Sequence, residues 1–281
     1  KIILKEKPKK FVVLGDTNSS LGAIIAKRLG LTVYHLEAGN RSYLKNSPEE
    51  INRKIIDHTS DINMPYTYRS CENLANEGLK RKNIFVIGNP ISEVINFYKG
   101  KIDKSKILDK LNIHKNKYVA CTMHREENVD DKNKLKVYMN LLYLISKKLK
   151  IPIIFPVHPR TKKNIKKFKI SIPKNIILIK PLGFLDFSNL EINSKFLITD
   201  SGTVQEEASI FRKLCLVFRE STERPETIEN GDSVIINSNL KNLKKINKII
   251  ERKLSSSTIK EYKIENVSQI AVNIINSDLK S

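Results

Sequence analysis

The stretch Phe196-Leu-Ile-Thr-Asp-Ser-Gly-Thr-Val-Gln-Glu-Glu-Ala-Ser-Ile210 decides how the rest of the chain is interpreted. Its apolar start, Phe196 to Ile198, has the length of a buried strand. Asp200 to Gly202 are turn residues, and Thr203 followed by Glu206 has capping-box spacing, which predicts a helix beginning there. A strand, a glycine-containing turn and a helix N-terminus form an anion site, because the unpaired N–H groups of the first turn face the strand's end.

The polar residues of this stretch suit a nucleoside diphosphate. Ser201 and Thr203 add hydroxyl donors, and Gly202 lets a diphosphate approach the backbone. Glu207, one turn into the helix, is within reach of a ribose diol. An ordinary capped helix behind a core strand is the alternative interpretation of this stretch on its own.

Length and composition indicate a soluble globular protein. The chain has 281 residues, room for one large or two medium domains, and is 40% hydrophobic. No apolar run approaches the ~18–20 residues that span a bilayer, so we expect no membrane partner. The apolar part of the first ten residues is too short for a signal peptide. Because no initiator Met is present, we expect a fragment or a processed product.

The net charge of +21 is the main compositional anomaly. Such an excess is typical of nucleic-acid binding. The lysines are nevertheless scattered over the chain, with no Arg-rich arm and no basic run interleaved with aromatics. A solvated lysine coat is therefore the favoured interpretation, and we expect no nucleic-acid partner. A basic surface also raises the encounter rate with an anionic substrate.

Cysteine and histidine spacing gives no sign of a metal or redox site. Cys71, Cys121 and Cys215 lie far apart, with no C-x-x-C pair, so a reducing cytoplasm is expected. Cys121 stands in an apolar run and is interpreted as a core residue. Neither an H-x-x-H pair nor a carboxylate cluster of metal spacing occurs, so no metal is predicted.

The beginning of the chain predicts a βαβ unit. Residues 11–14 and 32–36 are apolar strands, and between them Leu21, Ile24, Ile25 and Leu29 share one helical face. This order implies a parallel sheet with a right-handed crossover. Ligands of such sheets bind beyond the carboxyl ends of the strands. Asp16 and Glu37 both follow strand ends, which makes them candidate site residues.

Two successive βα series predict an α/β fold with two Rossmann-like domains facing a cleft. We expect the first domain at residues 1–100, a junction at 101–116, where Lys, Asp and Asn alternate, and the second domain at 117–281. Further strands are expected at 62–66, 84–87, 118–121, 151–157, 176–179, 214–218 and 233–236. The chain is expected to finish with helices at about 240–252 and 266–277.

Polar motifs follow four strands of the second series. They are His124-Arg125-Glu126, His158-Pro159-Arg160, the Asp200 turn and Thr222-Glu-Arg-Pro-Glu226. Strand ends converge on one rim, and two histidines, several arginines and a helix N-terminus suit a nucleotide diphosphate. Neither a G-x-G-x-x-G nor a Walker motif is present.

The first domain instead offers carboxylates: Asp16, Glu37 and Glu49. Carboxylates suit proton transfer on a sugar, and a cationic cradle suits charge on a departing diphosphate. Each motif also has a plainer interpretation. Glu49 and Glu50 suit the dipole of a helix N-terminus, His158 can bond to a neighbouring backbone group, and the loop 222–226 can be a solvated ion-pair loop.

With these residues placed, the sequence resembles the non-hydrolysing UDP-N-acetylglucosamine 2-epimerase family. The matching stretches follow the family's order over nearly the whole chain and are Gly15-Asp-Thr17, His35-Leu-Glu-Ala-Gly-Asn-Arg41, Pro48-Glu-Glu-Ile-Asn-Arg53, Gly88-Asn89, His124-Arg-Glu-Glu-Asn128, His158-Pro-Arg160, Asp200 to Glu207 and Thr222 to Glu226.

The resemblance implies a glycosyltransferase-B-like fold and inversion at C2 of a UDP-sugar, by elimination and re-addition of UDP. It implies no cofactor, and we expect a homodimer that serves surface polysaccharide synthesis. The residues matching catalytic positions are Asp16, Glu37, Glu49 and His124. The residues expected to bind UDP or the sugar are Arg41, Arg125, His158, Arg160, Phe184, Ser201, Gly202, Thr203, Glu207 and Arg224.

Two departures from the family pattern bear on the function. The family opens with a strand and a G-T-R-P-E-like turn, and nothing like it precedes Gly15, so the first domain is expected to be incomplete at its N-terminus. Residues 38–43, 61–63, 124–128 and 181–184 look closer to relatives that act on UDP-2,3-diacetamido-glucuronate or a UDP-6-deoxy-talosamine derivative. The alternatives are therefore a modified-sugar 2-epimerase, a hydrolysing relative, or a UDP-sugar glycosyltransferase of the same fold.

Overall fold

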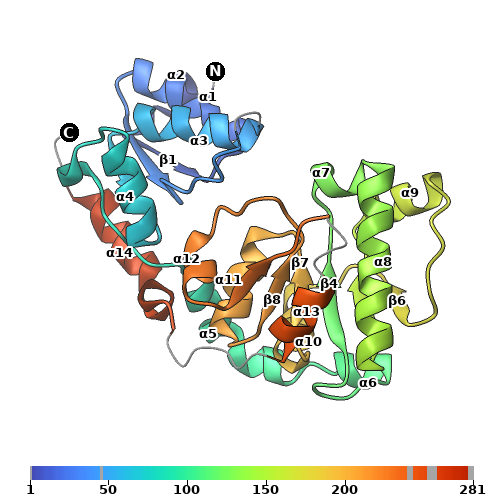
Figure 1. The fold of residues 1–281 in the computed structure, drawn as a ribbon. Coiled ribbons are helices and arrows are strands. Elements are labelled where there is room, and N and C mark those ends of the chain that lie inside the picture. Colours follow the sequence, from blue (N-terminus) through green and yellow to red (C-terminus); the bar gives the residue numbers. More distant parts are fainter. Residues whose placement is uncertain (1, 45–46, 239–242, 252–257, 278–281) are drawn as a thin grey trace. The chain divides into compact units, whose positions relative to one another are not determined.

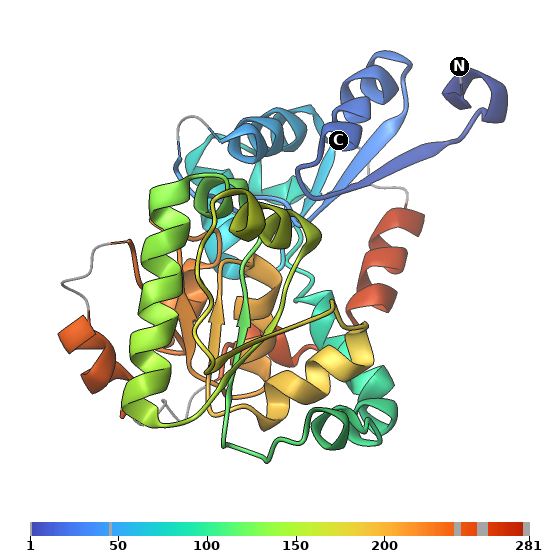
Figure 2. The same ribbon diagram turned by 90° about the vertical axis from the view of Figure 1, so that its right-hand side faces the viewer.

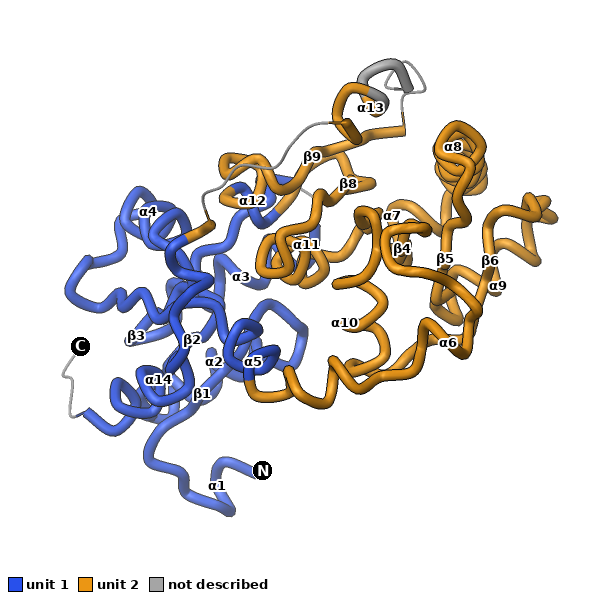
Figure 3. Tube along the Cα trace, turned by 90° about the horizontal axis from the view of Figure 1, so that it is seen from below, with its two compact units in different colours: residues 1–96, 223–225, 260–281 blue, residues 97–222, 226–259 orange. Residues whose placement is uncertain are grey.

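The computed structural model describes residues 2–44, 47–238, 243–251 and 258–277. The chain divides into two compact units, coloured separately in Figure 3. Unit 1 comprises residues 1–96, 223–225 and 260–281, and unit 2 comprises residues 97–222 and 226–259.

Unit 1 is built on a parallel sheet in the order β1-β2-β3. Its side chains alternate between two apolar layers, as a strand requires. Val33 of β2 packs with Ala23 and Ile56, whereas its neighbour Tyr34 packs with Met64 on the other face. The elements are α1 (Ile2–Glu6), β1 (Lys10–Leu14), η1 (Asn18–Leu21), α2 (Gly22–Arg28), β2 (Thr32–Leu36), α3 (Pro48–Thr59), β3 (Ile62–Met64), α4 (Tyr68–Asn76), η2 (Arg81–Asn83), the start of α5 (Pro90–Asp103), η4 (Lys260–Lys263) and α14 (Val267–Asn276).

Unit 2 is built on a six-stranded parallel sheet in the order β6-β5-β4-β7-β8-β9. Val119 and Cys121 of β4 pack into the layer under helix α8, and Ala120 packs into the opposite layer with Leu190 and Val204. Helix α8 runs along one face of this sheet (Figures 1 and 2). The elements after α5 are α6 (Ile107–Leu111), β4 (Val119–Thr122), α7 (Glu126–Val129), α8 (Lys132–Leu149), β5 (Ile153–Pro156), α9 (Pro159–Lys167), β6 (Ile176–Ile179), α10 (Phe184–Asn193), β7 (Leu197–Thr199), α11 (Gly202–Ile210), β8 (Cys215–Val217), α12 (Pro225–Glu229), β9 (Ser233–Ile235) and α13 (Leu243–Ile250).

The strand order of unit 2 reverses between β4 and β7. From β4 the chain builds outward through β5 and β6, then returns to place β7, β8 and β9 on the other side. Ligands of open parallel sheets bind at such a switch point, beyond the carboxyl ends of the two strands. Here β4 leads into His124, and β7 leads into Asp200 and Ser201.

The end of the chain departs from the sequence-based domain division. Residues from Lys260 onward belong to unit 1, whereas we expected them in the second domain. The reason is the apolar face of α14, whose Val267 and Ala271 pack into the layer that contains Tyr34 and Met64. Segment 223–225 also belongs to unit 1.

Two further expectations differ locally. Residues 101–116 hold the end of α5 and all of α6, so the expected junction is largely helical. The strand expected at 84–87 is reduced to a single parallel bridge between Ile84 and Asn63. Beyond the bridge, the backbone N–H of Phe85 donates to the backbone oxygen of Asn63, and that of Ile87 donates to the backbone oxygen of Pro65. Of the helix expected at about 240–252, the structure describes α13 (Leu243–Ile250); residues 239–242 and 252 lie outside the described residues.

No helix among the described residues is long and apolar enough to cross a membrane.

A glycine is required at position 39. Gly39 has φ +77°, and a Cβ there would lie 2.2 Å from the backbone oxygen of Ser70. We expect Gly39→Ala to lower the free energy of unfolding by about 3 kcal/mol or more. Gly30→Ala is the matched control, since φ is +80° with nothing within 4 Å of the added Cβ; it should cost about 1–2 kcal/mol. Urea unfolding of both variants measures the difference, and equal losses would contradict the close approach at Gly39.

Candidate active site

A buried guanidinium organises the polar cluster of unit 1. Arg53 lies on α3 with its side chain 3% exposed. Its Nη2 is 2.6 Å from Oδ2 of Asp16 and 3.3 Å from Oε1 of Glu37, and it also donates through Nη1 to the backbone oxygen of Glu37. Asp16 follows β1 and Glu37 follows β2, so one arginine joins the carboxyl ends of two neighbouring strands.

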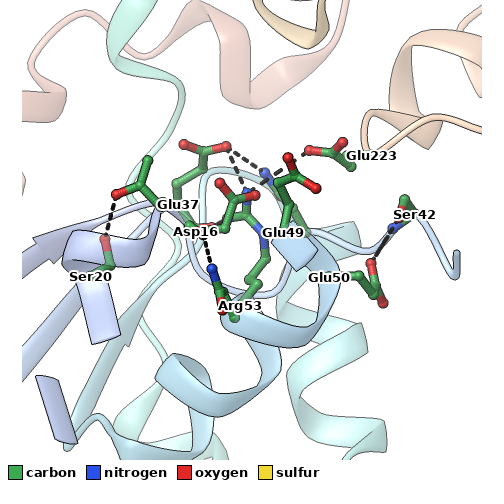
Figure 4. A network of polar contacts seen from close by, with 12 residues as sticks. Asp16, Ser20, Glu37, Ser42, Glu49, Glu50, Arg53 and Glu223 are labelled. Carbon is green, nitrogen blue, oxygen red and sulfur yellow. Dashed lines mark hydrogen bonds and ion pairs between the residues drawn. The ribbon is translucent and has the colours of Figure 1, made fainter. Parts of the chain in front are cut away.

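A second arginine reaches the same carboxylates from a distant part of the sequence. Nη2 of Arg224 lies 2.8 Å from Oε1 of Glu37, and Glu223 Oε2 is 3.9 Å from Arg53. Figure 4 shows the carboxylates of Asp16, Glu37 and Glu49 gathered near Arg53, with Glu223 beside them. The short segment 223–225 thus completes the cluster in unit 1.

The pKa values of Asp16 and Glu37 are displaced in opposite directions. Burial raises the pKa of Asp16 above its usual value, an effect that Arg53 opposes and that the neighbouring Glu223 and Glu37 reinforce. Burial also acts to raise the pKa of Glu37, but the guanidiniums of Arg224 and Arg53 outweigh it, so this pKa is lowered. Two adjacent carboxyls are therefore biased toward different protonation states.

The backbone at Glu37 is held in an uncommon conformation. Its φ is +64°, in the left-handed region that side-chain-bearing residues seldom adopt. Asn40 Nδ2 donates to its Oε1 over 3.3 Å, and Gly15 opposite has no side chain to occupy the space next to Oε2. Such strain persists where surrounding contacts over-determine it, and it concentrates at functional sites.

Glu49 and Glu50, adjacent at the start of α3, have different surroundings. Glu49 is exposed and accepts a hydrogen bond from the Ser47 hydroxyl at 2.7 Å. Glu50 is buried and accepts from both the backbone N–H and the hydroxyl of Ser42, at 2.8 and 3.0 Å. Glu50 therefore holds the preceding loop in place, whereas the carboxylate of Glu49 stays exposed (Figure 4).

Arg41, which the resemblance assigns to UDP-sugar binding, is paired with carboxylates inside unit 1. Its side chain is fully buried, and its guanidinium bonds Asp57 at 2.7 Å and Glu77 at 2.6 and 2.7 Å. Burial acts to lower the pKa of Arg41, but these carboxylates outweigh it and raise that pKa. Asp57 also bonds His35 Nδ1 at 2.8 Å, so Arg41 belongs to a buried network that supports the loop after β2.

In unit 2, a buried carboxylate organises the switch point. Asp200 is fully buried and accepts backbone N–H groups from His124 at 3.1 Å and Arg125 at 2.9 Å. Nδ2 of Asn128 donates to the same carboxylate at 3.1 Å and to the backbone oxygen of Phe218 at 2.7 Å. Asp200 therefore pins the loop after β4 to the turn after β7.

His124 and His158 lie together at this rim. Their ring centroids are 5.7 Å apart, and Nδ1 of His124 is 3.5 Å from Asp200. Burial lowers the pKa of His124, and Arg125 and His158 add to this effect, while Asp200 partly opposes it. His124 is therefore neutral at pH 7 and keeps one N–H to donate. Nδ1 of His158 accepts a hydrogen bond from the backbone N–H of Arg160 at 3.2 Å. His158 therefore caps the N-terminus of α9, in agreement with its plainer interpretation as a residue that bonds a neighbouring backbone group.

The helix after β7 begins earlier than the capping-box spacing predicts. Helix α11 starts at Gly202 with Ser201 as its N-cap, so Thr203 lies inside the first turn. The Ser201 side chain makes no capping bond; its backbone N–H bonds the Thr199 hydroxyl at 3.0 Å. Because the Ser201 side chain does not accept from the first turn, the helix N-terminus keeps N–H donors for an anion.

The other predicted site residues of unit 2 differ in exposure and in the partners that they contact. Arg160 is exposed and forms a two-pronged pair with Asp130 at 2.6 and 2.9 Å, with Glu126 3.1 Å away. It is thus already engaged by carboxylates on α7 and at its end. Phe184 begins α10, and its ring lies edge-on to Tyr98 at 6.1 Å between centroids. The backbone of Arg125 is fixed by Asp200, and Glu207 is buried in α11.

The sequence-based list missed the residues that hold the candidates in place: Arg53, Glu223, Asp200 and Asn128. Each lies inside a motif that was recognised, so a signal was present. The acidic start of α3 followed by Arg53 within the same helix points to a cation for neighbouring carboxylates. An aspartate directly after a buried strand, such as Asp200, commonly accepts backbone N–H groups.

Among the described residues, no three histidine, cysteine, aspartate or glutamate side chains are arranged to hold a metal ion.

The model of one protein family, described as UDP-N-acetylglucosamine 2-epimerase, matches residues 1–276. The chain belongs to this family. The resemblance drawn from the motifs is thereby confirmed, as is membership in a family of isomerases. The α/β fold of glycosyltransferase-B type, with two Rossmann-like domains, is also confirmed.

Individual relatives support the assignment. A UDP-N-acetylglucosamine 2-epimerase of Methanocaldococcus jannaschii is 40% identical over 267 residues, covering 90% of this chain and 71% of the relative. The crystal structure of the M. jannaschii UDP-GlcNAc 2-epimerase with UDP-GlcNAc and UDP superposes with a TM-score of 0.90 at 37% identity, over 98% of this chain and 77% of that one. A UDP-2,3-diacetamido-2,3-dideoxy-D-glucuronate 2-epimerase of Pseudomonas aeruginosa is 36% identical, over 84% of this chain and 65% of the relative.

The environment of His124 predicts two opposite titration shifts. Asp200→Asn removes the charge that supports the imidazolium, so the pKa of His124 should fall further below its usual value. His158→Gln removes a like charge, so the pKa should rise. NMR titration of the imidazole in wild type and both variants measures the shifts, and movement in the same direction would contradict the assigned causes.

Proposed function

We propose that this chain is a non-hydrolysing epimerase that interconverts UDP-GlcNAc and UDP-ManNAc by eliminating UDP and adding it back. The observation that carries the proposal is the pair Asp16 and Glu37, which share Arg53 and have oppositely displaced pKa values. Such a pair assigns an acid and a base. Its occurrence in a chain of the 2-epimerase family supports epimerisation over other reactions of this fold.

Inversion at C2 requires two proton-handling groups. C2 must lose its proton on one face of the sugar and regain one on the other. Glu37, held ionised by Arg53 and Arg224, suits the base, and Asp16, which holds a proton more readily, suits the acid. Glu49 is a third candidate, because it matches a catalytic position of the family and lies at the start of α3, the helix that carries Arg53.

The reaction balances without an external reactant. A carboxylate accepts the proton from C2, and the electron pair of the C2–H bond forms a C1=C2 double bond. At the same time the C1–O bond breaks, and its electron pair leaves with UDP. UDP oxygen then re-forms the bond to C1 while a carboxyl delivers a proton to the opposite face of C2. Because the C2 proton is not acidic, stabilising the departing diphosphate supplies much of the rate. His124, neutral at pH 7, donates its N–H to that diphosphate.

Unit 2 supplies the nucleotide-binding groups. The first turn of α11, with Ser201, Gly202 and Thr203, binds the diphosphate through its unpaired N–H groups and hydroxyls. Glu207 accepts from the ribose diol. Phe184, at the start of α10, and His158 line the nucleotide.

A second candidate substrate has a specific observation in its favour. The P. aeruginosa relative at 36% identity is named for UDP-2,3-diacetamido-2,3-dideoxy-D-glucuronate. The chemistry at C2 is the same for both sugars, so the carboxylate cluster serves either. The M. jannaschii relatives, named for UDP-GlcNAc, favour the simpler sugar.

We also propose a cytoplasmic enzyme that supplies surface polysaccharide synthesis. Three buried free cysteines fit a reducing compartment. From the family resemblance we propose a homodimer. Light scattering coupled to size exclusion should give twice the monomer mass, and a monomer mass at micromolar concentration would refute the dimer.

Proton NMR in heavy water tests the function. UDP-GlcNAc incubated with the protein should lose its H2 signal while a manno epimer appears, because the proton returned to C2 comes from solvent-exchanged carboxyls. Free N-acetylmannosamine with UDP would instead indicate hydrolysis. Exchange seen only with the diacetamido glucuronate would assign the modified sugar. Absence of exchange with both sugars would refute the epimerase.

Two variant classes separate proton transfer from binding. Asp16→Asn and Glu37→Gln should abolish H2 exchange, a loss of at least about 10³-fold, while UDP binding by calorimetry stays near wild type. Ser201→Ala should weaken UDP binding and leave the pKa displacements of unit 1 unchanged. Normal exchange in either carboxylate variant would overturn the acid–base assignment.

A further inference from the structure

The end of β1 is held by the strand beside it. The backbone N–H of Gly15 donates to the backbone oxygen of Leu36 at 3.1 Å, and the backbone oxygen of Gly15 lies 3.1 Å from Nε2 of His35. Gly15 has φ +69°, so the chain turns at this residue, and Asp16 follows it directly. Because the Gly15 carbonyl belongs to the peptide bond that leads into Asp16, a bond to its oxygen fixes the direction in which Asp16 leaves the strand.

His35, on β2, is fully buried between two acceptors. Its Nε2 faces the Gly15 carbonyl, and its Nδ1 lies 2.8 Å from Oδ1 of Asp57 on α3. The contact at Nδ1 is an ion pair without the alignment of a directed hydrogen bond. A carbonyl oxygen and an ionised carboxylate only accept, and two acceptor atoms repel at such distances. Each ring nitrogen therefore needs a proton of its own.

Asp57 is ionised and has no proton to offer His35. Its carboxylate accepts from the backbone N–H of Gly39 at 3.2 and 3.3 Å, and Nη2 of Arg41 lies 2.7 Å from it. Burial acts to raise the pKa of Asp57, but His35 and Arg41 outweigh burial, so that pKa is lowered.

The ion pairs of this network balance in charge when His35 is an imidazolium. Arg41 pairs with Asp57 and Glu77, and Asp57 pairs with His35, so two cations face two carboxylates. On β3, the residue level with His35 is Asn63, which does not titrate. A neutral imidazole would leave one of the two carboxylates without its own cation, and an uncompensated buried charge is costly.

We propose that His35 is a positioning residue for Asp16: a doubly protonated imidazole that donates through Nε2 to the Gly15 carbonyl and pairs through Nδ1 with Asp57. The inference rests on the proposed function, in which Asp16 transfers a proton at C2 of the sugar. Helix α3 then holds the turn after β1 at two points. Arg53 pairs with the Asp16 carboxylate, and Asp57, one turn later on the same helix, holds the backbone through His35.

The two attachments fix different parts of Asp16. The ion pair with Arg53 constrains the carboxylate, whereas the bond from His35 constrains the peptide group at its base. A group held at both ends is placed more narrowly, and a misplacement of about 1 Å lowers a reaction rate by about 10²-fold. Nδ2 of Asn52 also donates to the Asp16 backbone oxygen at 2.9 Å, so the turn keeps one backbone attachment when the His35 bond is removed.

Two substitutions separate the two nitrogens of His35. The amide nitrogen of glutamine reaches the position of Nε2, so His35→Gln keeps the donor to Gly15. Asparagine reaches only the position of Nδ1, so His35→Asn loses the donor to Gly15 and keeps a donor toward Asp57. Ile56→Val is the matched control, because it removes one buried methyl group of α3 from the apolar layer that α2 and α3 share.

Long-range proton–nitrogen NMR of the wild-type protein counts the protons on His35. The signals are assigned by their loss in His35→Gln. At pH 7 the two ring nitrogens of His35 should give the close pair of signals typical of an imidazolium. The two widely separated signals of a neutral imidazole would overturn the proposal, whatever the variants do.

The rate of H2 exchange from the UDP-sugar, compared with UDP affinity from calorimetry, tests the positioning. His35→Asn should lower the exchange rate by about 10²-fold, whereas His35→Gln should stay within about tenfold of wild type. The UDP affinity of both variants should stay within about twofold of wild type, because UDP is proposed to bind groups of unit 2. Ile56→Val should change neither quantity by more than about twofold.

The outcomes separate this inference from the function on which it rests. If His35→Asn and His35→Gln exchange at the same rate, or if UDP affinity falls together with exchange, His35 supports folding alone and the proposal is overturned. If wild type exchanges H2 while its His35 is neutral, the inference fails and the proposed function stands. If wild type exchanges H2 from neither sugar, the proposed function fails first and the positioning role with it.

Discussion

The buried guanidinium of Arg53 is the interaction on which unit 1 depends. Glu223 lies close enough to raise the pKa values of both Asp16 and Glu37, and Glu37 adds to the rise at Asp16, so without a cation these carboxyls would hold protons or separate. Burial acts against the charge of Arg53, but the surrounding carboxylates outweigh it and raise the arginine's pKa. The Arg53 side chain also connects α3 to the ends of β1 and β2. The same residue therefore influences the pKa values of the carboxylates and joins the elements that carry them.

In unit 2 the buried group that organises the candidate site is the carboxylate of Asp200, whereas in unit 1 it is the cation of Arg53. A buried carboxylate accepts backbone N–H groups from His124 and Arg125 and an amide from Asn128. These hydrogen bonds to the Asp200 carboxylate set the direction of the loop that carries His124. The candidate site residues Asp16, Glu37 and His124 are thus held in place by Arg53 and Asp200, which are buried beside them. This is why both Arg53 and Asp200 escape a search for catalytic residue types.

The pKa values of buried carboxyls in this protein are displaced in either direction, depending on the charge of the neighbouring groups. Glu37 contacts two guanidiniums, which lower its pKa and keep it ionised. For Glu191 on α10 and Glu207 on α11, burial is the largest influence and a neighbouring carboxylate adds to it, so the pKa values of both groups are raised. The same type of side chain therefore has a lowered pKa in unit 1 and a raised pKa in unit 2. Amino-acid type alone does not distinguish them, because the difference lies in the charge of the neighbours.

The amino-acid sequence by itself determined the parallel α/β class and the residues at strand ends. Alternation within strands and helical periodicity are local, and they place Asp16, Glu37, His124 and Ser201 at carboxyl ends. Tertiary structure alone decided which side chains meet. Arg53 pairs with Asp16 across 37 positions and Arg224 with Glu37 across 187. It also buried Arg41 against Asp57 and Glu77, and returned α14 to unit 1. Periodicity carries no information about such contacts, because they depend on how separate elements pack.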